Sequence, residues 1–471
     1  MASTPFGSAA PYAEPLWHSR QISPYYSESH KKVQAYVRDY VDNNLKPYAE
    51  EYEKQGFLPP EALRLHAEKG FTIIRPTKRE YMGGVSMPAG IEPEEWDEFH
   101  SLIVVDELSR LGYAGVIWGL FGGNGIGCPP IMNFGSEAQR LEYMPKVSRG
   151  EIRFCLGITE PDAGSDVANI KTTAKRSGNK YIVNGAKKWI TNGLWADYCT
   201  AAVRTGGPGR KGISLLIVPL AAKGVTRRRM ENSGVNASGS TFIEFDDVEV
   251  PVENLIGTEN HGFTYIMSSK LVTLVPNNPL SPPFPGLPIY PRSQKFSIQT
   301  NHQEDFNPER LSMAAACIRL SRVCAEDAYN YAITRETFGQ PLIANQIIRA
   351  KFSKFGELIE PCQAYLEQLT YTLHVAAKTG RQDVDVGGMT ALLKVMTTRC
   401  LEKVCREAQQ VMGGAGYNKS GKGARIEQIS RDVRVFVVGG GSQEILSDLA
   451  VRQEMKNLDG LQHAAKKGAK I

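Results

Sequence analysis

The sequence lacks the paired spacings of cysteine and histidine that mark metal and redox sites. Its 471 residues include eight cysteines and eight histidines, and none of them form a CxxC or an HxxxH pair. Structural zinc sites and dithiol redox motifs depend on such short spacings. We therefore predict no metal site, and the scattered cysteines are typical of reduced thiols in an intracellular protein.

Long hydrophobic runs and a strong excess of one charge are also missing. No apolar run approaches the ~20 residues that a membrane-spanning helix needs, and the net charge is only +5. The local basic run from Arg227 to Arg229 is followed by Glu231, as is typical of a solvated strand face. Neither a membrane partner nor a nucleic-acid partner is predicted.

The two ends of the chain differ in their resemblance to targeting signals. Residues 1–28 form an N-terminal tail with too few basic residues for a mitochondrial presequence. The last three residues, Ala469-Lys470-Ile471, follow a basic stretch within residues 461–471 and resemble the SKL-type peroxisomal address. We predict a peroxisomal location; a plain basic tail on a cytoplasmic protein is the alternative interpretation.

Hydrophobic periodicity divides the rest of the chain into three domains. Residues 29–150 show helical spacing, and residues 151–258 show the β-branched alternation and Gly/Asn turns of a β domain. Residues 259–460 return to helical spacing. The prediction is an α+β fold in which the last domain is an antiparallel four-helix bundle. Its four expected helices cover residues 307–339, 347–360, 388–414 and 442–454.

One segment of the last domain has a different composition. Residues 270–303 contain seven prolines between Pro276 and Pro291, few charges and no periodicity. Such a composition is typical of a disordered loop. We interpret the segment as an insertion near the entrance of the active site, or as intron sequence retained by a wrong gene model.

A loop and a hairpin between residues 153 and 192 predict a ligand site. Two β-like runs meet at Gly178-Asn179, a turn pair that suits a hairpin. Ahead of them, the TEPDAGSD loop at residues 159–166 leaves hydroxyls and backbone N–H groups free to face a ligand. After them, Trp189 and Thr191 are spaced to share one strand face. A planar heterocycle with polar edges would fit there.

These residues also carry a family resemblance. TEPDAGSD followed by KKWITNG resembles the flavin-facing signature of the acyl-CoA dehydrogenase family. The resemblance implies helix, sheet and helix domains in that order, an FAD cofactor, and a homodimer or homotetramer, because family FAD sites are shared between subunits. The positions that match flavin contacts within one subunit are Ile158, Thr159, Ser165, Trp189, Thr191, Ser442 and Glu444. The positions that match contacts to a neighbouring subunit's FAD are Arg335, Phe338, Gln346, Gln410, Gly413 and Gly414.

The implied reaction is α,β-dehydrogenation of an acyl-CoA thioester, in which a carboxylate takes the α proton and flavin N5 takes the β hydride. Desolvation can raise the pKa of such a carboxylate toward ~6–7. Many members carry it in a YEGTSQI-like motif, but here VVGGGSQEI has Gly440 at that position. Long-chain and isovaleryl types carry it in an ERL context, which matches Glu309 here. We assign Glu309 as the base; a glutamate that stabilises a helix start is the alternative.

The resemblance also implies the substrate contacts and the electron acceptor. The matching substrate positions are Ser165, Arg310, Gly440 and Gly441. The glycines at 439–441 predict room for a long or branched acyl group. Electrons would pass to an electron-transfer flavoprotein, or to O₂ if the protein is an acyl-CoA oxidase. A third interpretation is a flavin-fold protein that binds a partner without turnover, which the slight net charge disfavours for nucleic acid.

Overall fold

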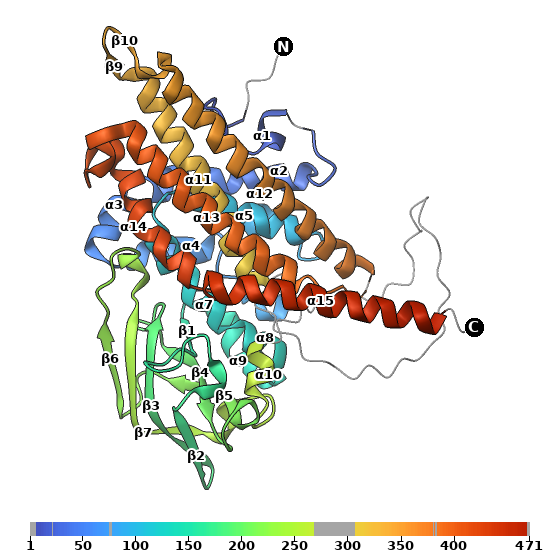
Figure 1. Ribbon diagram of the computed structural model, residues 1–471. Helices are drawn as coiled ribbons and strands as arrows, with labels where there is room; N and C mark the ends of the chain where they lie inside the picture. The colour runs from blue at the N-terminus through green and yellow to red at the C-terminus, as the bar shows by residue number, and fades with distance from the viewer. Residues whose placement is uncertain are drawn as a thin grey trace.

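The computed structural model describes residues 6–468 apart from 21, 75–77, 268–306, 380 and 382–383. Figure 1 shows the β domain at one end of the molecule and the long C-terminal helical bundle at the other, with α5 of the N-terminal region (Glu98–Ser109) packed against the bundle. The expected insertion at 270–303 and the C-terminal tripeptide at 469–471 lie outside the described residues. No described helix is both long enough and apolar enough to cross a membrane.

The N-terminal region is helical, as predicted. Its second helix buries Val33, Val37 and Tyr40, and Val41 follows directly after it, so the predicted stripe forms the inner face. This face packs against α5 (Glu98–Ser109). The helices are α1 (Leu16–Arg20), α2 (Glu28–Tyr40), α3 (Ala49–Gln55), α4 (Pro60–Glu68), α5 (Glu98–Ser109), α6 (Ala114–Ile117), α7 (Gly123–Gly127), α8 (Pro129–Phe134) and α9 (Glu137–Ser148), with a π-helical turn η4 (Trp118–Gly122) between α6 and α7.

The middle region folds into one sheet with the order β6-β7-β3-β2-β4-β5-β8, and β1 pairs in parallel with β4. Its strands are β1 (Phe154–Gly157), β2 (Thr173–Ser177), β3 (Lys180–Ile190), β4 (Tyr198–Arg204), β5 (Ile213–Pro219), β6 (Val225–Arg229), β7 (Thr241–Pro251) and β8 (Leu255–Ile256). The predicted hairpin is confirmed: Ser177 pairs with Lys180, and Gly178 between them has φ +63°.

The central strands are buried on both faces, which explains their continuous apolar sequence. Residues 199–203 of β4 and 213–218 of β5 are all inaccessible to solvent. Helices α8, α9 and α10 (Gly262–Met267) supply apolar side chains to the cluster on one face, and β3 and β7 supply those on the other. The sheet is therefore held rigidly against the helices.

Among the described residues after 306, the C-terminal region forms five α-helices where the sequence predicted four. The unpredicted helix, α14, has the helical apolar spacing of Ile426, Ile429 and Phe436, all of which are buried. Helices α11 to α14 form the bundle, and α15 packs across α13 (Figure 1). The elements are α11 (Asn307–Thr334), the hairpin β9 (Glu336–Thr337) and β10 (Gln340–Pro341), α12 (Gln346–Thr379), α13 (Gly387–Met412), α14 (Ala424–Val438) and α15 (Gln443–Gly468).

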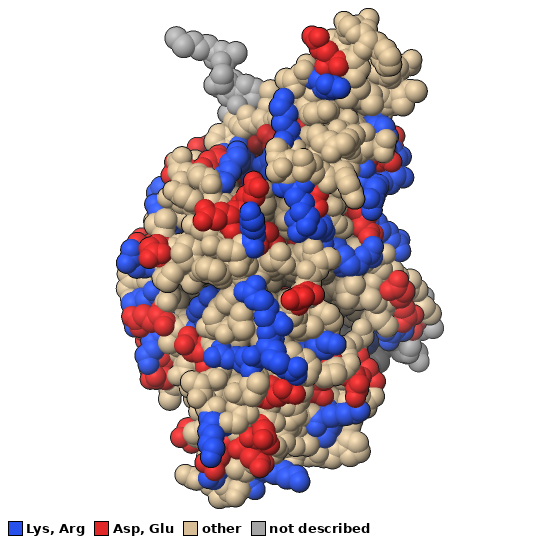
Figure 2. All heavy atoms as spheres, turned by 90° about the vertical axis from the view of Figure 1, so that its left-hand side faces the viewer, with Lys and Arg blue, Asp and Glu red and all other residues tan. Residues whose placement is uncertain are grey.

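The surface carries both signs of charge. Figure 2 shows basic and acidic side chains interspersed over one face, without a large area of a single sign. The basic run of the sequence lies on the edge strand β6, where Arg228 pairs with Glu244 at 3.2 Å and Arg229 donates to the carbonyl of Gly56 at 2.7 Å. This arrangement is the solvated strand face that the sequence predicted.

A buried carboxylate joins the three regions. Asp432 on α14 accepts hydrogen bonds from the backbone N–H of Val235, at 2.8 Å, and of Ala114, at 3.2 Å. Gln428 donates a third, at 2.8 Å. Burial and the nearby Glu53 carboxyl raise the pKa of Asp432 to about 8, although the donated hydrogen bonds oppose the shift.

Glu53 on α3 completes this junction. Its carboxylate accepts the backbone N–H groups of Asn236, at 2.5 Å, and Ala237, at 3.2 Å, and Gln428 donates to it at 3.3 Å. The amide of Gln428 therefore bridges two buried acids. One N-terminal helix, one loop of the β domain and one C-terminal helix meet at this point.

Replacing Asp432 is expected to destabilise the whole chain. In Asp432→Ala two buried N–H groups lose their acceptor, at ~1–3 kcal/mol each, so the free energy of unfolding should fall by about 2–6 kcal/mol. Urea unfolding followed by circular dichroism measures this loss.

The raised pKa of Asp432 gives this junction a pH dependence of known sign. The folded state keeps a proton that the unfolded state releases, so the contribution to stability is present at acidic pH and is lost as pH rises toward about 8. Asp432→Asn, which cannot ionise, should therefore cost less stability at about pH 8 than at about pH 6. Asp448→Asn, at an exposed position of α15, is the control. Equal costs of Asp432→Asn at both pH values would contradict the prediction.

Candidate active site

The TEPDAGSD loop is shaped by a buried ion pair. Glu160 accepts a hydrogen bond from Lys187 Nζ at 2.7 Å, and both side chains are almost inaccessible to solvent. Lys187 also donates to the carbonyl of Ile158 at 3.1 Å, and Glu160 accepts the N–H of Thr172 at 3.0 Å. Burial alone would favour the neutral acid, but the Lys187 ammonium and hydrogen bonds lower the pKa of Glu160. Sequence reasoning missed both partners.

The loop and the end of β3 lie side by side. The carbonyl of Thr159 accepts the N–H of Lys188 at 2.8 Å, so the two halves of the predicted flavin signature are adjacent. Ile158 is buried, Thr159 is half-buried and Ser165 is exposed. The three predicted contacts therefore lie along the segment that leads into this loop and within it, and the side chain of Ser165 is accessible to solvent.

Trp189 departs from the regular strand geometry on which the prediction relied. The β3–β7 pairing shifts register between Lys187 and Ile190, and Trp189 has φ +64°. Thr191 lies beyond the last residue of β3 and is half-buried beside Gly122. The simple two-residue alternation therefore does not extend to this pair. The bulge leaves the large indole side chain 54% exposed, a strained arrangement of the kind that functional sites retain.

Asn192 anchors the end of β3, and the sequence did not single it out. Its Oδ1 accepts the N–H of Gly123 at 2.9 Å, and its Nδ2 donates to the carbonyls of Trp118, at 3.0 Å, and Ser238, at 2.8 Å. Its φ is +61°, which asparagine tolerates better than most residues. The Asn-Gly pair that closes KKWITNG was the available signal. Through Asn192, the π-helical turn η4 is fixed against the strand that carries Trp189.

A second group of predicted residues comes together where α11 begins. Arg310 is buried, and its Nε donates to the carbonyl of Gly440 at 3.3 Å. Met313 lies one helical turn further on, and a Cβ added at Gly440 would be 2.9 Å from its sulfur. Gly440 and Gly441 have φ +66° and +107°, which glycine adopts without strain. A glutamate at 440 would therefore displace Met313.

The same contacts describe the surroundings of the glycines at 439–441, for which room for a long or branched acyl group stays a prediction. Met313 fills the space above Gly440, and Leu446 would be 2.8 Å from a Cβ at Gly441. The missing side chains are replaced by neighbours from α11 and α15. Two predicted flavin contacts follow these glycines. Ser442 is half-buried, and Glu444 is exposed in the first turn of α15.

Glu309 has the electrostatics of a base that works near neutral pH. It is partly buried in the first turn of α11, next to Arg310. Burial raises the pKa of Glu309 to about 7, and the positive charge of Arg310 limits the shift. Its carboxylate is therefore desolvated enough to be basic and still ionises in the physiological range.

The predicted cross-subunit residues lie far from this site within one chain. Arg335 and Phe338 follow the C-terminal end of α11, and 28 helical residues make α11 about 42 Å long. Figure 1 shows the β9–β10 hairpin at the end of the bundle opposite to the start of α11. Phe338 is fully exposed. The other exposed members of this group are Arg335, Gln346, Gln410, Gly413 and Gly414.

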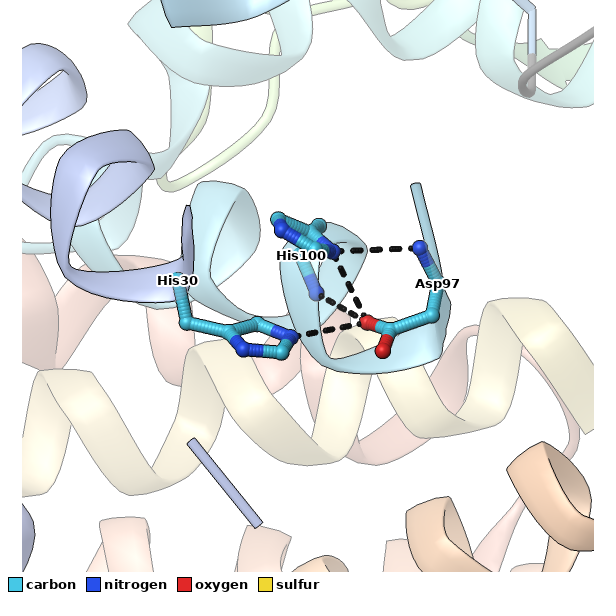
Figure 3. A group of neighbouring side chains, drawn as sticks. All are labelled: His30, Asp97 and His100. Atoms are coloured by element: carbon cyan, nitrogen blue, oxygen red, sulfur yellow. Dashed lines mark hydrogen bonds and ion pairs between the residues drawn. The ribbon is translucent and has the colours of Figure 1, made fainter. Parts of the chain in front are cut away.

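A histidine cluster elsewhere in the molecule has a structural explanation. Figure 3 shows His30, Asp97 and His100 in contact, and His30 Nε2 lies 2.9 Å from Asp97 Oδ1. The same oxygen accepts the N–H groups of Phe99 and His100, so Asp97 caps α5. Burial favours the neutral acid, yet the hydrogen bonds from both histidines hold the pKa of Asp97 well below its usual range. The cluster joins α2 to the start of α5.

The three regions each match a domain of one protein family. The N-terminal, middle and C-terminal domains of acyl-CoA dehydrogenase match residues 27–151, 155–248 and 300–455. The fold has the corresponding helix, sheet and helix order. The chain therefore belongs to the acyl-CoA dehydrogenase family of oxidoreductases, whose members are FAD-dependent.

Individual relatives cover almost the whole chain. It is 45% identical to the acyl-CoA dehydrogenase AFT10-1 of Alternaria alternata, over 96% of this chain and 98% of that protein. It is 38% identical to the acyl-CoA dehydrogenase apdG of Emericella nidulans, over 95% and 96% of the two chains. A crystal structure of a probable acyl-CoA dehydrogenase from Mycobacterium abscessus is 30% identical, with a TM-score of 0.76 over 91% of this chain and 99% of that one.

A further solved structure shares the fold at lower identity. It is an acyl-CoA dehydrogenase complexed with FAD from Bacillus anthracis, 22% identical, with a TM-score of 0.73. It covers 95% of this chain and 70% of its own.

Breaking the Glu160–Lys187 pair is expected to destabilise the β domain. Lys187→Met keeps the length of the side chain but leaves a buried carboxylate without its counter-charge, which costs ~3–5 kcal/mol in the free energy of unfolding. The double variant Lys187→Met/Glu160→Gln removes both charges and should recover part of that loss. Urea unfolding of the two variants measures the difference. A loss below about 1 kcal/mol in the single variant would contradict the ion pair.

Proposed function

We propose that this protein is an FAD-dependent acyl-CoA dehydrogenase in which Glu309 removes the α proton of the thioester. The observation that carries the proposal concerns two positions. Residue 440 is a glycine, and the desolvated Glu309 directly precedes Arg310, whose side chain contacts the carbonyl of Gly440. The pKa of Glu309, about 7, suits a general base that must be ionised at physiological pH.

The residues present fit an FAD ring system. The exposed indole of Trp189 offers a flat surface beside the loop that contains Thr159 and Ser165, and the Glu160–Lys187 pair keeps this loop in place. Bound there, FAD would supply the hydride acceptor for Cβ of the substrate. Trp189 and Thr191 would cover the ring, and Ile158 and Thr159 would line its edge.

The chain's own residues would orient the thioester and move one proton. The Glu309 carboxylate accepts the α proton, and its low solvation raises its basicity toward that carbon acid. Arg310 holds the backbone of Gly440, and Gly440 and Gly441 would present that backbone to the substrate. Ser165 would contact the pantetheine part from the opposite side. The substrate class is an acyl-CoA thioester.

We propose that the active enzyme is a homodimer or homotetramer. The support is the length of α11: Glu309 lies in its first turn and Arg335 directly after its last residue, so about 42 Å of helix separate the two in one chain. Arg335, Phe338 and Gln346 at one end of the bundle, together with Gln410, Gly413 and Gly414, would then hold the FAD of a neighbouring subunit. A positively charged guanidinium suits a pyrophosphate.

Two acceptors fit this chemistry. The dehydrogenase passes electrons to an electron-transfer flavoprotein, and the alternative, an acyl-CoA oxidase, passes them to O₂. A peroxisomal location through Ala469-Lys470-Ile471 would favour the oxidase, and one hydrogen peroxide per turnover in air would select it. A binding protein without turnover is disfavoured because the family is one of oxidoreductases.

Glu309→Gln is expected to abolish flavin reduction while FAD stays bound. Loss of a general base lowers the rate by ~10²–10⁴-fold. Anaerobic mixing with butyryl-, octanoyl-, palmitoyl- and isovaleryl-CoA, followed by the bleaching of the yellow flavin band, measures it. In the unaltered protein the rate should rise as pH increases through about 7, because only the carboxylate accepts a proton. Undiminished reduction in the variant would refute the role of Glu309.

Complementation between subunits tests the shared site. Arg335→Ala should weaken FAD binding by about tenfold or more, as expected for a lost charge-assisted contact. A mixed oligomer of Arg335→Ala and Glu309→Gln subunits should regain flavin reduction, because one of its sites combines an intact base with an intact arginine. Co-expression with two affinity tags gives the mixed species. A monomeric protein that retains FAD would contradict the proposal.

A further inference from the structure

Lys394 is a buried cation with no role of its own in the proposed reaction. It lies on α13, and its side chain is inaccessible to solvent. Its ammonium donates to the carbonyl of Val437 at 2.9 Å and to the carbonyl of Gly441 at 2.8 Å. These two carbonyls stand on either side of the turn at Gly439 and Gly440.

The position of this ammonium has a physical reason. Val437 lies in the last turn of α14, where backbone carbonyls have no partner inside the helix and carry the negative end of the helix dipole. A buried ammonium is stable only when it is hydrogen-bonded, and these carbonyls supply the acceptors. One side chain therefore fixes both the end of α14 and the start of the segment that leads into α15.

Arg310 contacts the same turn, from α11. Arg310 Nε donates to the carbonyl of Gly440, which lies between the two carbonyls that Lys394 holds. Met313 packs over the same glycine. Lys394 on α13 and Arg310 on α11 thus hold three carbonyls of one turn, and Glu309 precedes Arg310 in the chain.

We propose that Lys394 is a positioning residue, which clamps the turn at Gly439–Gly441 and thereby sets the place of Arg310 and Glu309 relative to the substrate. The inference rests on the proposed role of Glu309 as the base. It adds that the geometry of this base depends on a side chain that touches neither substrate nor cofactor.

The charge of Lys394 gives the clamp a pH dependence that a merely apolar contact would lack. Burial lowers the pKa of Lys394 to about 8; the Cys317 thiol and Glu444 raise it, and Arg310 lowers it. The ammonium is therefore present below about pH 8 and is lost as pH rises through that value. A neutral amine makes weaker hydrogen bonds than an ammonium. Flavin reduction should accordingly decline on the alkaline side of about pH 8.

The test uses the FAD-loaded enzyme and the acyl-CoA ester that reduces the unaltered protein fastest among butyryl-, octanoyl-, palmitoyl- and isovaleryl-CoA. Lys394→Met should slow anaerobic flavin reduction by about 10²-fold, as expected when a reacting group is misplaced by about 1 Å. The FAD content should change less than about threefold, because Lys394 does not belong to the residues proposed to hold FAD. The alkaline decline should disappear.

Two further variants separate positioning from general destabilisation. Leu401→Ala removes a fully buried side chain seven residues along the same helix, away from the turn, and should lower the melting temperature without slowing flavin reduction. Lys394→Arg keeps a cation and should retain more of the rate than Lys394→Met. If Lys394→Met does not fold, the alkaline decline of the unaltered enzyme and the rate of Lys394→Arg remain as the test.

Distinct results would overturn the inference and the proposed function. An unchanged rate and pH profile in Lys394→Met, or an equal slowing in Leu401→Ala, would overturn the positioning role alone. If no acyl-CoA of the panel reduces the flavin of the unaltered protein, the proposed function fails and the inference fails with it.

Discussion

The architecture depends on two carboxylates buried where the three regions of the chain meet. Asp432 and Glu53 share the amide of Gln428, and between them they accept four backbone N–H groups from the N-terminal and middle regions. Two acids this close would repel each other if both were ionised, and the raised pKa of Asp432 reflects that. The hydrogen bonds that Asp432 accepts oppose this rise in its pKa. The junction fixes α14, and α14 leads directly into the glycine turn of the active site.

The site itself is built from two rigid halves. One half is the β domain edge, where the Glu160–Lys187 pair and Asn192 hold the loop and the bulge that exposes Trp189. The other half is the contact between α11 and the turn after α14. In both halves buried side chains bond to backbone groups: Lys187 to the carbonyl of Ile158, Asn192 to three backbone groups, and Lys394 and Arg310 to the carbonyls of the turn.

Sequence reasoning succeeded where the signal is local. The hairpin at Gly178, the apolar stripe of α2 and the order of helical and β regions follow from turn chemistry and periodicity, and the structure contains them. It failed where partners are distant in sequence. The contact of Met313 with Gly440 was not foreseen, and the bulge at Trp189 arises from the pairing of β3 with β7. Helix α14 had the required spacing and was overlooked.

The sequence by itself determined the family and the domain order, and it showed glycine at 440 and glutamate at 309, because motifs and periodicity are properties of short stretches. Only the tertiary structure decided how Glu309 is desolvated and which cations hold the glycine turn. Burial and charge pairing depend on residues brought together from α11, α13 and α14. No local pattern encodes the distance between Lys394 and the carbonyl of Gly441, since packing of whole helices sets it.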